Sequence, residues 1–207
     1  MADTRAEKSA DEFARKPAVV LAPQPPLRIA DVIAVSSPFG ASPAQACDLP
    51  EAQDLATRLM EHKVASLETY LRVQAIQPAA VLVAKESGRV TGVAGLLFLR
   101  PAGVDQILAG EFDALDPADD LLTHEGECPA ALYAWGVAAA TKLGGQAILG
   151  GGRAVRLQLF PTITGFTRAV TGAGRHVALT RYGYRPLRHA DDDLMVSEPA
   201  LAAEKAA

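Results

Sequence analysis

The chain has 207 residues and a mass of 21.7 kDa, a length that suits one domain. Its net charge of −4 excludes a protein that binds nucleic acid through a basic charge spread over the whole chain. Its 49% content of hydrophobic residues excludes disorder over the full length and is enough for a core without a metal or disulfide.

The cysteines and histidines are not spaced as metal ligands. Cys47 and Cys128 form no CxxC pair, and the four histidines have no HxH or HxxxH spacing, so no metal site is predicted. Residues 1–16 hold four acids and four bases, unlike a signal peptide. The longest apolar stretch, residues 129–141, is too short to cross a bilayer. We therefore expect a cytoplasmic protein without membrane contacts.

Three segments are expected along the chain: a loosely ordered tail over residues 1–26, a single domain over 27–196 and a flexible tail over 197–207. Residues 17–50 hold 7 of the 14 prolines and should be extended or turning.

Two elements are predicted in the first third of the chain. Residues 27–35 are rich in isoleucine and valine, which favours a first strand. From residue 50 to 74 apolar residues recur at helical spacing, which predicts one long helix. Asp48 and Glu51 are spaced as a capping box at its start.

A β-hairpin is predicted next. The apolar runs 80–84 and 90–99 are joined by a charged turn that contains Gly88. Because both runs are nearly continuous, the sheet should be covered on both faces, in an α/β or α+β domain. Residues 130–140 fit either a buried alanine-rich helix or a central strand, and the spacing of their apolar residues does not decide between the two.

Charge is divided unevenly along the second half of the chain. Residues 105–127, the acidic segment, hold eight acids and no Lys or Arg, whereas residues 142–188, the basic segment, hold eight bases and no acid. The basic segment has few aromatic residues between its charges, which favours a small anionic ligand over nucleic acid.

Three stretches resemble the GNAT acyltransferases. The first is the hairpin VLVAKESGRVTGVAGLLFL, the second is KLGGQA over residues 142–147, and the third is RHVALTRYGYRP over residues 175–186. Lys142, Gly145 and Ala147 occupy the positions of the family pattern Arg/Gln-x-x-Gly-x-Gly/Ala. The resemblance covers about residues 80–188 and implies a mixed, mainly antiparallel central sheet with helices on both faces.

The resemblance also implies an acyl-CoA site at the second stretch. A strand that ends in a loop opening a helix presents backbone N–H groups and the positive end of the helix dipole to a phosphate. Gly144 and Gly145 would let the backbone approach a pyrophosphate, and Lys142 adds a charge. The residues expected to bind the cofactor are Val137, Ala138, Lys142, Gly144, Gly145, Gln146, Ala147 and Arg153. In the alternative, the two glycines only cap a helix and Lys142 is solvated.

Gly150, Gly151 and Gly152 complicate this interpretation, because three glycines inside a helix cost about 2–3 kcal/mol relative to alanine. Either the helix begins after Gly152, or the glycines admit a close neighbour. A third alternative is a strand, since apolar residues alternate over 155–159. We favour the helix, because the family resemblance requires one after the glycine loop.

The catalytic residues depart from the family. The resemblance implies a tyrosine four residues before Gly183 as the acid for the departing thiolate, but Leu179 stands there. Tyr182, Thr180 and His176 are nearby substitutes. His124, Glu125 and Glu127 precede the proposed central strand and are the expected bases, with a solvated acidic loop as the alternative.

These patterns predict an acyl-CoA-dependent N-acyltransferase that uses acetyl-CoA or another acyl-CoA and an amine of a small molecule or protein. The alternative is a catalytically inactive GNAT-like binding or regulatory module, which Leu179 favours. A third hypothesis is a scaffold or homodimer in which the acidic and basic segments pair between subunits.

Overall fold

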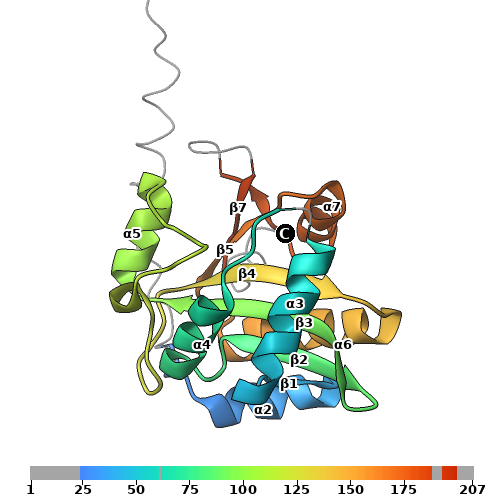
Figure 1. Cartoon of the computed structure of the whole chain (residues 1–207). Helices are drawn as coiled ribbons and strands as arrows, with labels where there is room; N and C mark the ends of the chain where they lie inside the picture. Colours follow the sequence, from blue (N-terminus) through green and yellow to red (C-terminus); the bar gives the residue numbers. More distant parts are fainter. Residues whose placement is uncertain (1–23, 61, 188–192, 200–207) are drawn as a thin grey trace, which may run out of the picture.

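The computed structural model describes residues 24–60, 62–187 and 193–199 and shows a seven-stranded sheet with helices on both faces (Figure 1). The strands are β1 (Ala41–Pro43), β2 (Val81–Glu86), β3 (Arg89–Leu99), β4 (Ala131–Ala139), β5 (Thr164–Arg168), β6 (Arg185–Pro186) and β7 (Leu194–Ser197). They lie in the order β1-β2-β3-β4-β5-β7-β6, and every neighbouring pair is antiparallel except β4–β5. The predicted mixed, mainly antiparallel sheet is confirmed.

Two layers of helices sandwich the sheet. The helices are α2 (Ile29–Ser36), α3 (Leu49–Leu59), α4 (Leu67–Ile76), α5 (Pro101–Ala109), α6 (Lys142–Ala154) and α7 (Gly172–Arg181), with short helical turns η1 (Ser37–Phe39), η2 (Ala46–Asp48), η3 (Asp119–Leu121) and the π-helical η4 (Val155–Leu159). Val81 and Val83 pack toward α3, whereas Leu82 and Ala84 pack toward α6. All four are buried, so the continuous apolar run reports a strand covered on both sides.

The hairpin is also confirmed. β2 and β3 are joined by Ser87 and Gly88, whose φ values of 50° and 79° are both positive, as a type I′ turn requires. Residues 131–139 form the central strand β4, which decides between the two alternatives for that stretch.

Two predictions in the first third of the chain are wrong. Residues 29–36 form α2 rather than a strand, because Val32 and Ser36, four residues apart, are buried on the face that meets α6. The single helix over 50–74 is two helices, because Met60 is extended and the Ser66 hydroxyl accepts from the Thr69 amide to begin α4.

The capping box at the start of α3 is also formed differently. Gln45 and Asp48 make it at η2, whereas Glu51 accepts hydrogen bonds from Arg89 Nε and from the Val90 amide. Glu51 therefore ties α3 to β3 instead of capping the helix.

The glycines of α6 have close neighbours within this chain. The helix runs from Lys142 through all three consecutive glycines, and η4 follows in place of the alternative strand. A Cβ on Gly150 would lie 2.5 Å from Phe39 Cδ1, and one on Gly151 would lie 2.7 Å from Ala41 Cβ. These glycines let α6 approach η1 and β1 closely.

Gly144 has a similar role against β3, and this gives a testable difference. A Cβ on Gly144 would lie 2.6 Å from the Thr91 carbonyl oxygen, whereas one on Gly145 would meet only Ala139 Cβ at 3.5 Å. We expect Gly144→Ala to lower the free energy of unfolding, measured by urea denaturation, by about 1–3 kcal/mol. Gly145→Ala, the control, should raise it by up to about 1 kcal/mol through helix propensity. Equal stability of Gly144→Ala and the wild type would show that the helix does not pack this closely on β3.

Strand β7 extends past residue 196, the expected C-terminal end of the domain. Ser197 is buried and pairs with Gly165, so the sheet extends one residue beyond the expected end at 196. The tails expected at 1–26 and 197–207 lie outside the described residues over 1–23 and 200–207. Within the described residues, no helix is long and apolar enough to cross a membrane.

Candidate functional site

The sheet opens between β4 and β5. The two strands pair in parallel from Ala131–Thr164 to Ala134–Thr167, after which β5 ends and β4 continues to Ala139. A register shift at the same point leaves Trp135 as an extra residue of β4 opposite β3. Over residues 135–139, the edge of β4 that faces away from β3 therefore has no strand partner among the described residues.

A cavity of about 780 Å³ lies at this opening. Its size is that of a small-molecule site, and most of its lining is apolar. One part is lined by the segment between α3 and α4, by Tyr70 and by residues 112–115. The other part is lined by α6 and α7, so the cavity reaches both faces of the sheet.

Four buried or half-buried tyrosines line the cavity. Burial raises the pKa of Tyr70 and of Tyr133 to about 12, and it also raises the pKa of Tyr182 and Tyr184. The Tyr182 hydroxyl donates to the Leu149 carbonyl at 3.0 Å. All four phenols therefore stay protonated at neutral pH. A phenol must be protonated to donate a hydrogen bond to a ligand or a proton to a leaving group.

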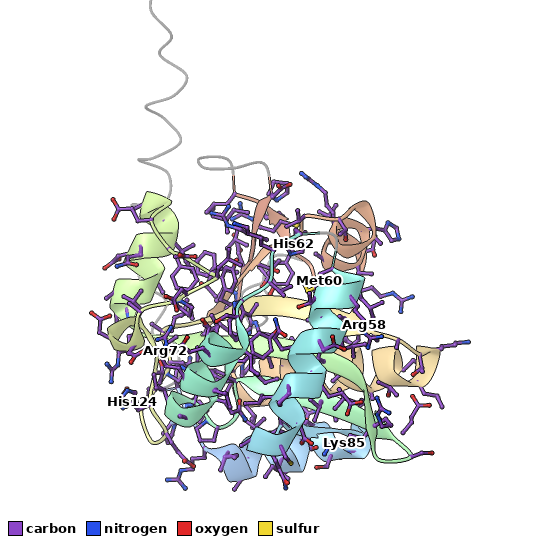
Figure 2. All side chains as sticks on the ribbon, in the orientation of Figure 1. Arg58, Met60, His62, Arg72, Lys85 and His124 are labelled. Carbon is purple, nitrogen blue, oxygen red and sulfur yellow. The ribbon has the colours of Figure 1, made fainter. Side chains whose placement is uncertain are left out.

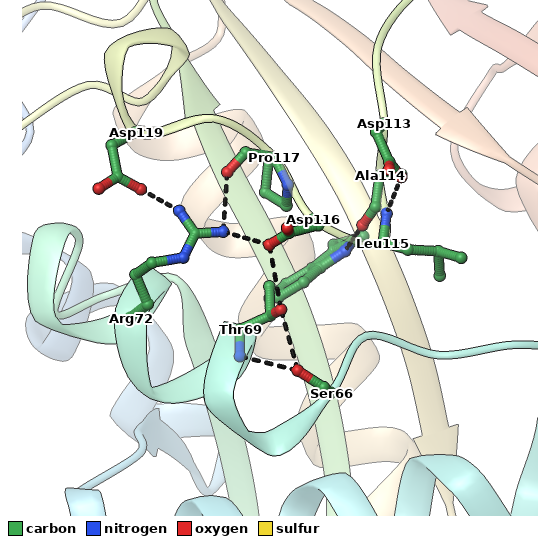
Figure 3. A network of polar contacts seen from close by, with 10 residues as sticks. Ser66, Thr69, Arg72, Asp113, Ala114, Leu115, Asp116, Pro117 and Asp119 are labelled. Atoms are coloured by element: carbon green, nitrogen blue, oxygen red, sulfur yellow. Dashed lines mark hydrogen bonds and ion pairs between the residues drawn. The ribbon is translucent and has the colours of Figure 1, made fainter.

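Part of the acidic segment forms one wall of the cavity and is held to α4 (Figure 3). Arg72 forms ion pairs with Asp116 and Asp119, and its Nη2 donates to the Pro117 carbonyl at 3.0 Å. Trp135 Nε1 donates to the Ala114 carbonyl, which joins this wall to β4. Arg72 lies outside the basic segment. Asp116 and Asp119 therefore pair with a cation of their own chain, whereas the scaffold hypothesis pairs the acidic segment with the basic segment of another subunit.

His62 is the only histidine among the described residues that line the cavity, and Asp113 is the only carboxylic acid there. His62 Nδ1 is buried and has no hydrogen-bond partner within the described part of the chain. Figure 2 shows His62 close to Met60, in the segment between α3 and α4, and far from His124. His62 is not among the residues predicted from the sequence, because the apolar spacing predicts one continuous helix over residues 50–74.

Arg156 is a second lining residue that the sequence analysis did not select. It is 8% exposed, its Nη1 donates to the Phe160 carbonyl, and its Nη2 donates to the Glu198 carbonyl at 3.3 Å. Burial lowers the pKa of its guanidinium. The π-helical turn at residues 155–159 carries this charge into the domain, and the sequence showed only an alternating pattern there.

The structure brings only two of the residues selected from sequence into the lining, Val137 and Tyr182. Ala138 is buried in the core beneath α3, and Gly144 and Ala147 pack α6 against the sheet. Lys142, Gln146 and Arg153 are exposed on α6, and Gly145 is partly exposed beside them. None of these four residues lines the cavity, although other residues of the same helix do.

The N-terminus of α6 already has an acidic neighbour. The Thr141 hydroxyl accepts from the Gly144 amide at 2.9 Å and donates to a Glu86 carboxylate oxygen at 2.5 Å. The hydrogen bond from the Thr141 hydroxyl and, after it, one from the Thr91 hydroxyl lower the pKa of Glu86. An anionic ligand at this helix end would therefore meet a negative charge.

His124, Glu125 and Glu127 do not line the cavity. These three residues precede the first residue of β4, whereas β4 and β5 separate only after Ala134. The part of β4 that is paired with β5 therefore lies between them and the opening. Glu127 pairs with Arg100 at 2.7 Å, and this contact, with the His124 amide, lowers the pKa of Glu127 to about 2. Glu125 accepts a hydrogen bond from the Ile29 amide at 3.3 Å.

No protein-family model matches the sequence, and no curated protein matches it. Three solved structures are similar in fold. The GNAT-like decarboxylase GphF in complex with isobutyryl-CoA is 20% identical, with a TM-score of 0.43 over 67% of this chain and 70% of that chain. A structure described as histone acetyltransferase HPA2 and related acetyltransferase, from Corynebacterium glutamicum, is 18% identical, with a TM-score of 0.45 over 77% and 96%. The loading GNATL domain of CurA from Lyngbya majuscula is 12% identical, with a TM-score of 0.42 over 71% and 69%.

Each of the three is described as a GNAT-like protein or an acetyltransferase. Because the similarity is low, the activity of this chain has to be argued from its own cavity.

Proposed function

We propose that this protein is an acyl-CoA-dependent N-acyltransferase. The observation that supports it is the cavity at the opening between β4 and β5, beside a strand edge that has no partner among the described residues. An extended ligand with amide groups, such as the pantetheine arm of coenzyme A, can pair with such an edge as an added strand would. The apolar cavity beyond the edge has room for an acyl group and part of an acceptor.

We place the phosphates of coenzyme A on the exposed face of α6. Lys142 lies in the first turn, with Gly145 and Gln146 after it and Arg153 farther along the helix. Gly144, Ala147 and Ala138 would then support the site by packing and would not touch the cofactor.

The chemistry needs one base and one acid. His62 would take a proton from the ammonium form of the acceptor, and the free amine would attack the thioester carbonyl. As the new C–N bond forms and the C–S bond breaks, the thiolate would take a proton from the Tyr182 hydroxyl, whose raised pKa keeps it protonated until that step. The nitrogen of the new amide would give up its extra proton, which restores the Tyr182 phenol, and His62 would release its proton to water. The products are the amide and free coenzyme A.

Calorimetry with acetyl-CoA, butyryl-CoA and coenzyme A tests this proposal directly. We expect binding in roughly the micromolar range, followed by release of free thiol when a panel of amines is added. If no acyl-CoA binds, the proposal is wrong. Binding without thiol release on any amine would support the alternative of a catalytically inactive module, which Leu179 favours.

The Glu86 carboxylate allows a sharper form of the binding test. Glu86→Gln removes one negative charge next to the proposed phosphate site, so we expect acetyl-CoA to bind about 3–10 times more tightly, most clearly at low salt. Glu68→Gln, an exposed acid on α4, is the control and should leave the affinity unchanged. An equal effect of both changes would place the phosphates elsewhere.

A further inference from the structure

Arg156 is a buried cation without an acidic partner among the residues that the structure describes. It is 8% exposed, and the groups that accept its hydrogen bonds are the neutral carbonyls of Phe160 and Glu198. Within the described residues no carboxylate pairs with it, and its Nε has no hydrogen-bond partner. A buried charge is costly unless it is paired, so this guanidinium keeps hydrogen-bonding capacity for an anion that the described residues do not supply.

The Nε–H group of Arg156, which has no hydrogen-bond partner among the described residues, shares one edge of the guanidinium with an Nη2–H. Nε–H and the neighbouring Nη2–H point the same way in the planar fork, and this is the edge that binds a carboxylate through two parallel hydrogen bonds. Nη1 donates to the Phe160 carbonyl at 2.5 Å, whereas the bond from Nη2 to the Glu198 carbonyl is long, at 3.3 Å. The free capacity of Arg156 therefore matches a carboxylate better than a single neutral acceptor.

Other polar groups gather at the same point. A Cβ on Gly165 would lie 2.5 Å from Ser197 Oγ, 2.9 Å from the Tyr184 hydroxyl oxygen and 3.4 Å from Arg156 Nε. The absence of a side chain at Gly165 lets these three buried groups converge. Arg156 and Tyr184 both line the cavity, so a ligand on its α6 side lies beside two members of this cluster.

The charge of the lining agrees with this chemistry. Among the described residues that line the cavity, Lys63, Arg156 and Arg168 are cationic, and Asp113 is the one acid. A low-dielectric cavity with an excess of positive charge favours an anionic group over a neutral group of the same shape.

We propose that Arg156, assisted by Tyr184, binds a carboxylate carried by the ligand of this cavity. The carboxylate belongs either to the acyl group or to the acceptor. These two sources exist only if the proposed acyl transfer takes place. The binding of a carboxylate to Arg156 does not depend on that reaction.

The first test uses the wild-type protein and simple probes. Butyrate should shift the Arg156 Nε–H resonance in a saturable way, and butyramide, its neutral counterpart, should leave it in place. Arg156→Lys assigns that resonance, because it removes the guanidinium while keeping a positive charge. If butyrate leaves the resonance unshifted, the proposal is overturned.

The second test locates the carboxylate. If the acyl group carries it, succinyl-CoA should bind at least ten times more tightly than butyryl-CoA. If the acceptor carries it, 4-aminobutyrate should have a KM at least ten times lower than butylamine. Arg156→Met, an apolar change of similar length, should abolish either preference, and Tyr184→Phe should reduce it while keeping the ring in the core. Arg58→Met, on the exposed surface of α3, is the matched control and should change neither.

The outcomes separate the two proposals. Binding of acyl-CoAs with no response to butyrate and no preference for either carboxylate would overturn the role of Arg156 and leave the acyltransferase proposal standing. A butyrate shift without binding of any acyl-CoA would support Arg156 and refute the acyltransferase.

Discussion

Replacing Gln77 by leucine lowers the free energy of unfolding by about 2–5 kcal/mol, because it leaves two buried backbone groups without partners. Gln77 is fully buried at the end of α4. Its Nε2 donates to the carbonyls of Phe98 and Thr123, at 2.5 and 2.8 Å, and its Oε1 accepts from the Phe98 amide at 3.2 Å. The Phe98 carbonyl keeps a second donor, the Thr123 amide, whereas the Phe98 amide and the Thr123 carbonyl lose theirs.

The position of Gln77 explains why the cost is large. β2 pairs with β3 only as far as Val81–Gly95, so among the described residues no strand lies beside Phe98 on that side of β3. The Gln77 side-chain amide makes the hydrogen bonds to Phe98 there. Urea denaturation of Gln77→Leu measures the effect. Gln158→Leu, at an exposed position, is the control and should change stability by no more than about 0.5 kcal/mol. A loss below about 1 kcal/mol for Gln77→Leu would show that these bonds are not formed in the folded protein.

The parts of the fold that the sequence predicted correctly are those with local causes. The hairpin depends on Ser87-Gly88, which adopts the two positive φ values of a tight turn, and on apolar runs that any covered strand requires. The first strand and the long helix were wrong because packing against α6 and the Ser66 cap decided them. The spacing of Ser66 and Thr69 was a signal in the sequence that could have shown the second helix start.

The site was harder to predict because its residues meet only in three dimensions. The basic segment and the glycines drew attention to α6, but the sequence did not show that Gly144 faces the Thr91 carbonyl. Nor did it show that Glu127 is committed to Arg100, on another element. His62 and Arg156 belong to the cavity only because a helix breaks at Met60 and because η4 turns a charge inward.

Replacing His62 by glutamine should lower kcat for acylation of an alkylamine by about 10²–10³ while leaving the affinity for acetyl-CoA unchanged. An alkylamine is protonated at pH 7 and needs a base in the cavity, where His62 is the only histidine among the described lining residues. Hydroxylamine is already neutral at that pH, so its acylation should fall much less. A thiol-release assay with the two acceptors measures both effects. This difference distinguishes loss of a base from general damage to the cavity, which would slow both acceptors equally.

The matched change is His124→Gln, because the sequence selected His124 and the structure places it outside the lining of the cavity. The two histidines therefore test sequence against geometry in the same assay. If His124→Gln slows the alkylamine selectively and His62→Gln does not, the loop before β4 supplies the base, and the chemistry takes place at a different end of the strand. If His62→Gln alone is selective, the break between α3 and α4 is the feature that makes the site catalytic, since it brings His62 to the opening between β4 and β5.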